Sequence, residues 1–249
     1  LAAFQADVAR TIAEVVALVN RNQEVKARYR PQPLRALLID DCIERGLEYN
    51  AGGARYNWSV VNIAGIPDTI DSLAAVREAV FEKRELTGAE MVALLDADFA
   101  GAEGTRLRLA ACPRFGNDDP AADGLGADFT RFLFEEFRRH RPWRGGRFLP
   151  SSIQFVTYES AGTPVGATPD GRRAGRPLAD SIGPASGRDT HGPTAMLRSV
   201  ARLPLHLATG TPVLNMRFTK ELFRTPQGRA QVRGLVEGFF LLGGMQVQL

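Results

Sequence analysis

Apolar side chains recur every three or four residues in several stretches of the chain, the pattern of helices that bury one face. In the first part of the chain this spacing predicts helices over residues 5–20, 33–45, 68–83, 87–95 and 103–110, then a long one through Phe129, Phe132, Leu133 and Phe137. The sequence Thr-Gly-Ala-Glu at 87–90 is a capping box, in which side chains satisfy the free amides of a first helical turn. Two more helices are expected over residues 193–203 and from Thr225 onwards.

Short runs rich in β-branched and aromatic residues lie between these helices and predict strands. They are RYNWSVVNIAGI (55–66), SSIQFVTYES (151–160), TPVLNMRF (211–218) and MQVQL (245–249). FGNDDPAADG (115–124) has the composition of a loop. Because helices separate the successive strands, the strands should pair in parallel through crossover connections, which predicts an α/β fold.

Composition narrows the classes of protein without naming one. The 249 residues are 44% hydrophobic, enough for a sizeable core, and 31 basic against 28 acidic residues give a net charge of +3. The charges are interleaved, so no basic stripe predicts nucleic-acid binding. No apolar segment is long enough to predict a membrane span, and a cytoplasmic location is the expectation. Because the chain starts at Leu1 without methionine and stops at Leu249 inside an alternating apolar run, both ends are expected to be cut, which leaves a signal peptide open.

Side chains that often carry chemistry form no recognisable motif. His140, His191 and His206 lie in different predicted elements, and none has the helical spacing of a metal motif. No G-x-S-x-G elbow predicts a serine hydrolase. Cys42 and Cys112 predict neither a disulfide framework nor a thiolate metal site. Cys42 lies on the apolar face of its predicted helix beside acidic residues, so we interpret it as a structural residue.

One stretch, GATPDGRRAGRPLADSIGPASGRDTHGPTAML (166–197), has the glycines of a loop that could hold a ligand. A Walker loop needs Lys and Ser or Thr after a glycine, but Gly171 is followed by Arg172 and Arg173, and the glycine spacing of a Rossmann loop is also missing. Pro-Asp-Gly at 169–171 instead predicts a rigid turn. We expect Arg172 and Arg173 to clamp carboxylates or carbonyls of neighbouring segments.

Eight stretches, in this order, resemble the glycyl radical enzymes of the pyruvate formate-lyase superfamily. They are DDCIERG, GGARYN, DSLAAVREAVFE, FGNDD, GATPDGRRAGRPLAD, GPTAMLRSVARL, VLNMRF and GGMQVQ, and they span almost the whole chain. GATPDGRRAG with GPTAMLRSV is more similar to the dehydratase, decarboxylase and C–N lyase branches, such as those that act on glycerol, choline or hydroxyproline. The resemblance implies an α/β fold that is half of a ten-stranded barrel, with parallel strands and crossover helices over residues 1–249.

The resemblance also implies a radical chemistry for the parent enzyme. An activase that uses S-adenosylmethionine and an iron–sulfur cluster installs a glycyl radical, which passes to a cysteine that abstracts hydrogen from a small-molecule substrate. The family's cysteine lies in a Gly-Cys loop upstream of DDCIERG, so Cys42 does not match it. The family's glycine lies in an Arg-Val-(Ala or Ser)-Gly-Tyr loop downstream of GGMQVQ. The resemblance therefore implies a fragment of a cytoplasmic, homodimeric lyase or dehydratase that lacks both the cysteine loop and the radical loop, has no catalytic residue or bound metal of its own, and is inactive alone.

Substrate contacts are expected on the strand predicted at 151–160, because barrel interiors take alternate side chains from each strand. Ser152, Gln154 and Val156 share one face, and Ile153, Phe155 and Thr157 share the other. We favour the first set, since a small polar substrate needs a hydroxyl and an amide among apolar walls.

Two other classes of protein remain open on the sequence. One is a non-catalytic remnant, or an accessory subunit that completes the barrel of another chain. The other is an unrelated α/β domain that binds an anion through Arg172 and Arg173.

Overall fold

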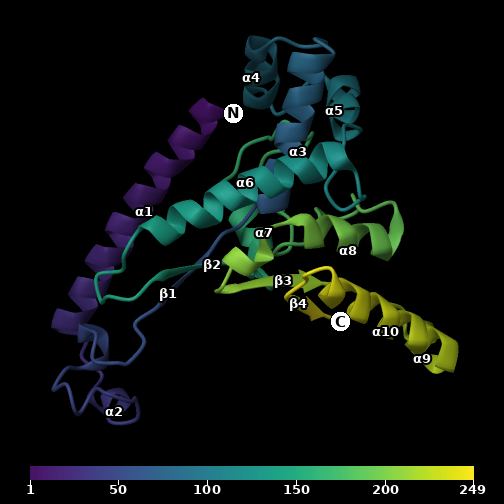
Figure 1. Ribbon diagram of the computed structural model, residues 1–249. Helices are drawn as coiled ribbons and strands as arrows, with labels where there is room; N and C mark the ends of the chain where they lie inside the picture. The colour runs from purple at the N-terminus through teal and green to yellow at the C-terminus, as the bar shows by residue number, and fades with distance from the viewer. The chain divides into compact units, whose positions relative to one another are not determined.

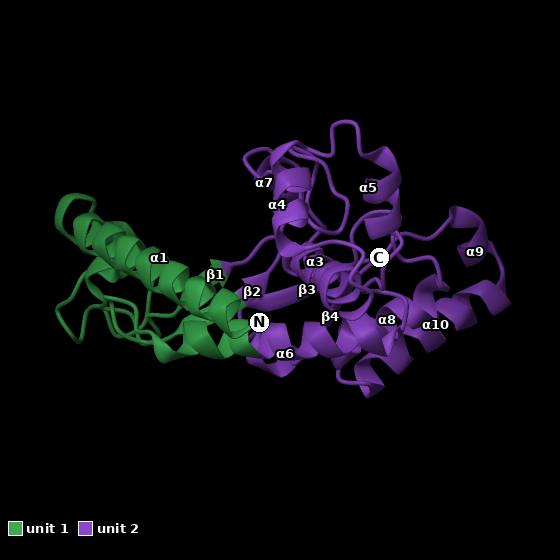
Figure 2. Cartoon of the chain, turned by 90° about the horizontal axis from the view of Figure 1, so that it is seen from above, with its two compact units in different colours: residues 1–61, 132–150 green, residues 62–131, 151–249 purple.

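A computed structural model describes all residues from Leu1 to Leu249, and the chain divides into two compact units. Unit 1 consists of residues 1–61 and 132–150, and unit 2 of residues 62–131 and 151–249 (Figure 2). The long helix α6 (Pro120–Arg139) and the strands β1 (Ser59–Asn62) and β2 (Phe148–Ser152) contribute residues to both units.

Unit 1 is built on one long helix, α1 (Ala2–Tyr29), drawn in purple in Figure 1. The predicted helix at 5–20 is confirmed and continues to Tyr29, with Ile12 and Val16 buried. The short helix α2 (Pro33–Ala36) and the 3₁₀ turn η1 (Tyr49–Ala51) follow. Side chains of α6, including Phe134 and Phe137, are also buried in this unit.

The helix predicted over 33–45 is wrong beyond Ala36. Leu34, Leu37 and Leu38, which were expected on a buried face, are 77%, 62% and 86% exposed. Asp41 has a φ of 75°, a left-handed conformation that ends helical geometry, and its carboxylate pairs with Arg55 at 2.6 Å. Helices in proteins are stabilised mainly by packing of their apolar face, and these leucines stay exposed, so the periodicity alone does not produce a helix here.

Unit 2 holds most of the remaining helices, and the helices predicted from periodicity are present. Their bounds are α3 (Ile66–Val76), the π-helical turn η2 (Arg77–Glu82), α4 (Gly88–Asp96), α5 (Glu103–Ala110), α7 (Thr157–Gly162), α8 (Gly192–Arg202), the 3₁₀ turn η3 (Leu205–Leu207), α9 (Lys220–Arg224) and α10 (Pro226–Leu241). The predicted capping box of α4 is confirmed, because Thr87 accepts from Glu90 N and the Glu90 side chain accepts from Thr87 N. Helix α6 begins at Pro120, inside the predicted loop 115–124, because Asp119 accepts from the amide of Ala121 and caps it.

A four-stranded sheet has the order β1, β2, β3 (Thr211–Asn215) and β4 (Gln246–Gln248). The pairs β2–β3 and β3–β4 are parallel, with Ser151 opposite Thr211 and Leu214 opposite Val247. The predicted α/β class with parallel strands and crossover helices is therefore confirmed. Ten fully buried side chains form the core of unit 2: Ile66, Ile70, Phe99, Leu109, Phe115, Ile182, Val200, Leu205, Leu214 and Phe239.

Two strand predictions were too long. Residues 55–66 form only the short strand β1, which lies at one end of the sheet order and has Val60 exposed. The strand predicted over 151–160 ends at Ser152. Phe155 has a φ of 49°, and the carbonyl of Gln154 accepts the amide of Thr157, so the chain turns into α7.

Candidate functional site

The Pro-Asp-Gly segment of the 166–197 loop forms the rigid turn that the sequence predicts. The amide of Gly171 donates to Thr168 O and the amide of Thr168 donates to Arg172 O, both at 2.9 Å. The Asp170 carboxylate accepts the Thr168 hydroxyl inside the turn. Gly171 has a φ of 80°, and a Cβ there would lie 2.7 Å from the Arg106 carbonyl oxygen, so the position requires glycine on two grounds.

The two arginines after the turn bind protein groups. The Arg172 guanidinium is buried and donates to four carbonyl oxygens, those of Gly162, Val165, Gly166 and Arg173, at 2.7–3.4 Å. Arg173 donates to Asp98 O and to the Glu103 carboxylate, both at 2.6 Å. The predicted clamp is confirmed, and both guanidiniums are already hydrogen-bonded within the protein.

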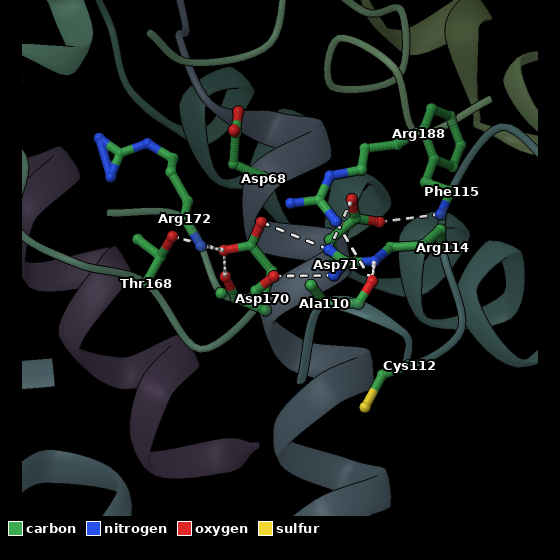
Figure 3. Close-up of polar contacts among 12 residues, drawn as sticks. Asp68, Asp71, Ala110, Cys112, Arg114, Phe115, Thr168, Asp170, Arg172 and Arg188 are labelled. Atoms are coloured by element: carbon green, nitrogen blue, oxygen red, sulfur yellow. Dashed lines mark hydrogen bonds and ion pairs between the residues drawn. The ribbon is translucent and has the colours of Figure 1, made fainter. Parts of the chain in front are cut away.

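Beneath this turn, one arginine joins two buried carboxylates from different segments (Figure 3). Arg114 lies 3.5 Å from Asp71 of α3 and 3.4 Å from Asp170 of the turn. It also donates to the carbonyl oxygens of Leu109 and Ala110 at the C-terminal end of α5. We call Asp71, Arg114 and Asp170 the buried triad. It fixes the loop against α3 and α5.

Burial shifts the protonation of the aspartates around the triad. Desolvation raises the pKa of Asp71 to about 7, and the Arg114 charge opposes this rise. Desolvation likewise raises the pKa of Asp68 to about 6, although its carboxylate accepts the amide of Ala179 at 2.8 Å. Burial lowers the pKa of Arg188, which donates to Ala110 O. Burial therefore brings the pKa values of Asp68 and Asp71 close to neutral pH.

A cavity of about 850 Å³ in unit 2 lies against this loop. Its wall runs from the turn through residues 183–189, and it reaches Asn215, the last residue of β3. Ligand sites of parallel sheets lie at the carboxyl ends of strands, which is where Asn215 stands. Six arginines and five carboxylates line the cavity: Arg106, Arg172, Arg173, Arg176, Arg188, Arg217, Asp68, Glu159, Asp170, Asp180 and Asp189.

The polar groups in this cavity suit a small ligand with hydrogen-bonding groups. Asp180 accepts from the Asn215 amide and from the Ser181 hydroxyl, both at 2.9 Å, which holds the end of β3 to the loop. Arg176 and Arg217 are exposed and form no ion pair. Asp68 brings a carboxyl group of raised pKa to the same wall. The cavity therefore offers free donors, fixed acceptors and one group that can transfer a proton.

The predicted substrate residues lie at the end of β2 and beyond it. Ser152 is fully buried and donates to Ile63 O at 3.3 Å. Gln154 is buried, and its side-chain amide nitrogen has no hydrogen-bond partner. Val156 is 78% exposed. Because the extended backbone ends at Ser152, the three side chains do not share one strand face as expected, and none of them lines the 850 Å³ cavity.

Two family models together cover most of the chain. Residues 1–162 match the family described as pyruvate formate lyase-like. The chain belongs to this family. Residues 178–249 match the family described as glycine radical. The alternative of an unrelated anion-binding domain is thereby removed.

Named relatives of this pyruvate formate lyase-like chain are much longer. Trans-4-hydroxy-L-proline dehydratase of Clostridioides difficile is 33% identical over 91% of this chain and 29% of its own length. (2S)-3-sulfopropanediol dehydratase of Klebsiella oxytoca is 30% identical over 92% of the chain and 28% of its own. The structure of the B12-independent glycerol dehydratase of Clostridium butyricum in its glycerol-bound form matches with a TM-score of 0.95 and 31% identity, over 99% of this chain and 31% of that one. The chain spans about three tenths of the length of these relatives.

Neither cysteine of this pyruvate formate lyase-like chain lines the unit 2 cavity. Cys42 is buried, and so is Cys112, whose pKa is raised by burial. No glycine between Leu1 and Leu249 stands in an Arg-Val-x-Gly-Tyr stretch. No cluster of three His, Cys, Asp or Glu side chains is arranged to hold a metal ion, and no helix combines the length and apolar character needed to cross a bilayer.

Asp68, Asp71 and Arg114 were not among the residues predicted from the sequence. Asp68 and Asp71 are three residues apart on α3, a helix that also buries Ile70 and Ala74. Acidic side chains are rarely buried without a charged or hydrogen-bonding partner, so two of them on a largely apolar helix indicate that such partners lie nearby. That signal was present in the sequence, but the identity of the partners was not.

Proposed function

We propose that the protein containing this chain is a glycyl radical lyase or dehydratase that acts on a small polar substrate by radical hydrogen abstraction. The observation that carries the proposal is the match, at 31% identity and a TM-score of 0.95 over 99% of the chain, to a dehydratase structure with glycerol bound. Other relatives bear the names of a hydroxyproline dehydratase and of isethionate sulfite-lyases. All of these names describe small polar substrates, and all describe cleavage of a substituent.

In this proposal residues 1–249 supply part of the barrel, whereas the cysteine loop and the radical loop come from other parts of the protein. The partners are a radical S-adenosylmethionine activase, which carries the iron–sulfur cluster, and a second copy of the enzyme. The location is cytoplasmic. The 249-residue chain alone performs no turnover, because it holds neither member of the radical pair.

Ser152, Gln154 and Val156 stay our proposed substrate contacts. The side-chain amide nitrogen of Gln154 is a buried donor without a partner, and such donors are rare because they lose a hydrogen bond to water. A substrate hydroxyl or carboxylate would satisfy it. Val156 has an exposed apolar side chain that can serve as a wall for the same substrate.

The test compares two preparations under anaerobic conditions, each with the activase and S-adenosylmethionine. The whole protein encoded by the gene should show a glycyl radical by electron paramagnetic resonance and should dehydrate or cleave a member of a panel of glycerol, trans-4-hydroxy-L-proline and isethionate. The 249-residue chain should show no radical. A radical on the short chain, or a whole protein that forms the radical and turns over no small polar alcohol, amino acid or sulfonate, would contradict the proposal.

The substrate contacts need their own variants. Gln154→Leu in the whole protein should lower kcat/KM by roughly tenfold while the radical signal is retained, because one hydrogen bond to the substrate is lost. Gln5→Leu on α1, far along the chain from β2, is the matched control. Equal activity of the two variants would remove Gln154 from the site.

A second candidate is a non-catalytic remnant or an accessory subunit that completes another chain's barrel. The observation that favours it is the absence of both radical-pair motifs between Leu1 and Leu249. Genomic sequence on both sides separates the two candidates. The enzyme requires a Gly-Cys loop upstream and an Arg-Val-x-Gly-Tyr loop downstream, and the remnant does not.

A further inference from the structure

Unit 1 contains a second cavity, of about 930 Å³, that none of the preceding functions uses. It is formed by the second half of α1, the turn that leads to α2, the 3₁₀ turn η1, and β1. Its size is within the range of about 300–1,000 Å³ in which proteins bind small molecules. All of its lining residues belong to unit 1.

The charge of this cavity is one-sided. Lys26, Arg30, Arg35 and Arg144 line it, and no carboxylate does. None of the four cations forms an ion pair. The carboxylate of Glu48 lies behind this wall, where it accepts the backbone amides of Gln32 and Asn50 at 2.6 and 2.7 Å, and it pairs with none of the four cations. Four unpaired positive charges around one cavity repel each other, and a bound anion would relieve that repulsion.

The arginines are held in place by an aromatic ring instead of by acids. The Arg35 guanidinium lies 4.9 Å from the centre of the Tyr49 ring, and the Arg144 guanidinium lies 5.6 Å from it. Cation–π contacts fix the two planes and leave their N–H groups free of acceptors. The Arg144 side chain donates to no protein oxygen, and its buried Nε has no partner. Paired guanidinium planes with free donors are suited to phosphate oxygens.

Buried amides build the floor of the cavity. Gln23 donates to the Ser59 hydroxyl at 2.8 Å and accepts the backbone amide of Arg144 at 3.3 Å. Asn50 donates to the backbone carbonyl of Arg30 at 2.8 Å. These contacts tie α1, η1, β1 and the 141–147 segment together. The cations are therefore displayed on a preorganised surface, which lowers the entropic cost of binding.

Two aromatic side chains complete the wall. Tyr29 and Trp58 line the cavity and are 69% and 51% exposed. Exposed aromatic faces next to cations are the surfaces on which nucleobases stack, at about 1–3 kcal/mol per base. The volume accommodates one nucleotide and is too small for a strand.

We propose that this cavity binds a nucleoside polyphosphate, whose phosphates contact Lys26, Arg35 and Arg144 and whose base stacks on Trp58. The phosphates neutralise the unpaired charge. The base covers an aromatic face that otherwise meets water.

The test is isothermal titration calorimetry of the 249-residue chain with ATP, pyrophosphate and adenosine at low ionic strength. ATP should bind most tightly, pyrophosphate more weakly and adenosine weakest, and added salt should weaken ATP binding. Lys26→Gln and Arg35→Gln should each weaken ATP binding by roughly tenfold, because each loses a charge-assisted contact. Lys26 is exposed and forms no ion pair, so Lys26→Gln should leave the unfolding midpoint of the chain unchanged, which urea unfolding checks.

Matched control variants distinguish binding in this cavity from non-specific binding of ATP to positive charge or to exposed aromatic side chains. Arg21→Gln removes the same charge from α1 outside the cavity and should leave ATP binding unchanged. Trp58→Ala should weaken ATP but not pyrophosphate, whereas Trp143→Ala, outside the cavity, should change neither. The proposal is overturned if ATP does not bind, if Arg21→Gln weakens binding as much as Lys26→Gln does, or if pyrophosphate binds as tightly as ATP.

Discussion

Replacing Arg114 by methionine tests the role of the buried triad most directly. Methionine keeps much of the length and apolar stem of the arginine but removes its charge and all its donors. The Arg114 side chain is 8% exposed, and those of Asp71 and Asp170 are 0% and 2% exposed, so the two remaining carboxylates cannot reach water without unfolding of the segment. The variant also removes the Arg114 hydrogen bonds to the carbonyl oxygens of Leu109, Ala110 and Asp170.

The magnitude of the loss follows from these contacts. Breaking a buried ion pair by removing one partner costs about 3–5 kcal/mol, because an uncompensated charge stays buried. With a urea slope of about 3 kcal/mol per molar for a chain of this size, the unfolding midpoint should fall by about 1–1.7 M. The loss should be greater at pH 8 than at pH 5. Asp71 has a pKa of about 7, so at pH 5 it is mostly protonated and needs its cation less.

Urea unfolding followed by far-ultraviolet circular dichroism measures both effects. Arg139→Met is the matched control: its side chain is 70% exposed and pairs with Glu136 on the surface, so the change in unfolding free energy should stay within about 0.5 kcal/mol. A loss below about 1 kcal/mol for Arg114→Met, or the same loss at both pH values, would show that the triad does not hold the loop by charge compensation.

Three further variants or conditions test the same structure. Gly171→Ala should lower the unfolding free energy by about 2–3 kcal/mol, because φ at this position is positive and the new Cβ would lie 2.7 Å from a carbonyl oxygen. Gly187→Ala is the control: its φ is 74° but no atom lies within 4 Å of the new Cβ, so it should lower the unfolding free energy by only about 1 kcal/mol. Thr87→Ala removes one half of a capping box and should cost about 1 kcal/mol in thermal or urea unfolding. From pH 5 to pH 8 the unfolding free energy should fall by several kcal/mol, because the folded state holds protons that the unfolded state has already lost. These protons are on Asp68, Asp71 and Asp123, whose pKa values burial raises to about 6, 7 and 6. Replacement of Asp68 and Asp71 by asparagine should remove most of this slope and leave the part that Asp123 contributes, and an unchanged slope would contradict the prediction.

Much of the fold could be predicted because its signals are local. Helical periodicity, the capping box at Thr87 and the turn at 169–171 each depend on residues a few positions apart, and all are present. The errors came where the outcome depends on distant neighbours. Residues 33–45 have helical periodicity, but the side chains of Leu34, Leu37 and Leu38 stay exposed and the helix ends at Ala36. The run at 151–160 has the composition of a strand, but the strand ends at Ser152 and Phe155 takes a left-handed conformation.

The site was less predictable than the fold for the same reason. Arg114 is 43 residues from Asp71 and 56 from Asp170, so no spacing rule joins them. The sequence did indicate that Arg172 would clamp nearby groups, because a polar, glycine-rich loop needs side-chain partners for its backbone. It could not indicate which oxygens those partners would be.

The contrast between Asp68 and Asp71 shows how a raised pKa must be interpreted in this chain. Both carboxyl groups owe their shift mainly to burial, and perturbed groups in clefts are candidates for function. Asp71, however, is sealed beneath the turn and faces Arg114, whereas Asp68 lines the cavity and has no bonded cation. The shift of Asp71 therefore reports the cost of holding the loop in place. The carboxyl group of Asp68 lines the cavity, where a ligand can contact it. A ligand that binds in the cavity should therefore change the pKa of Asp68 and leave the pKa of Asp71 nearly constant.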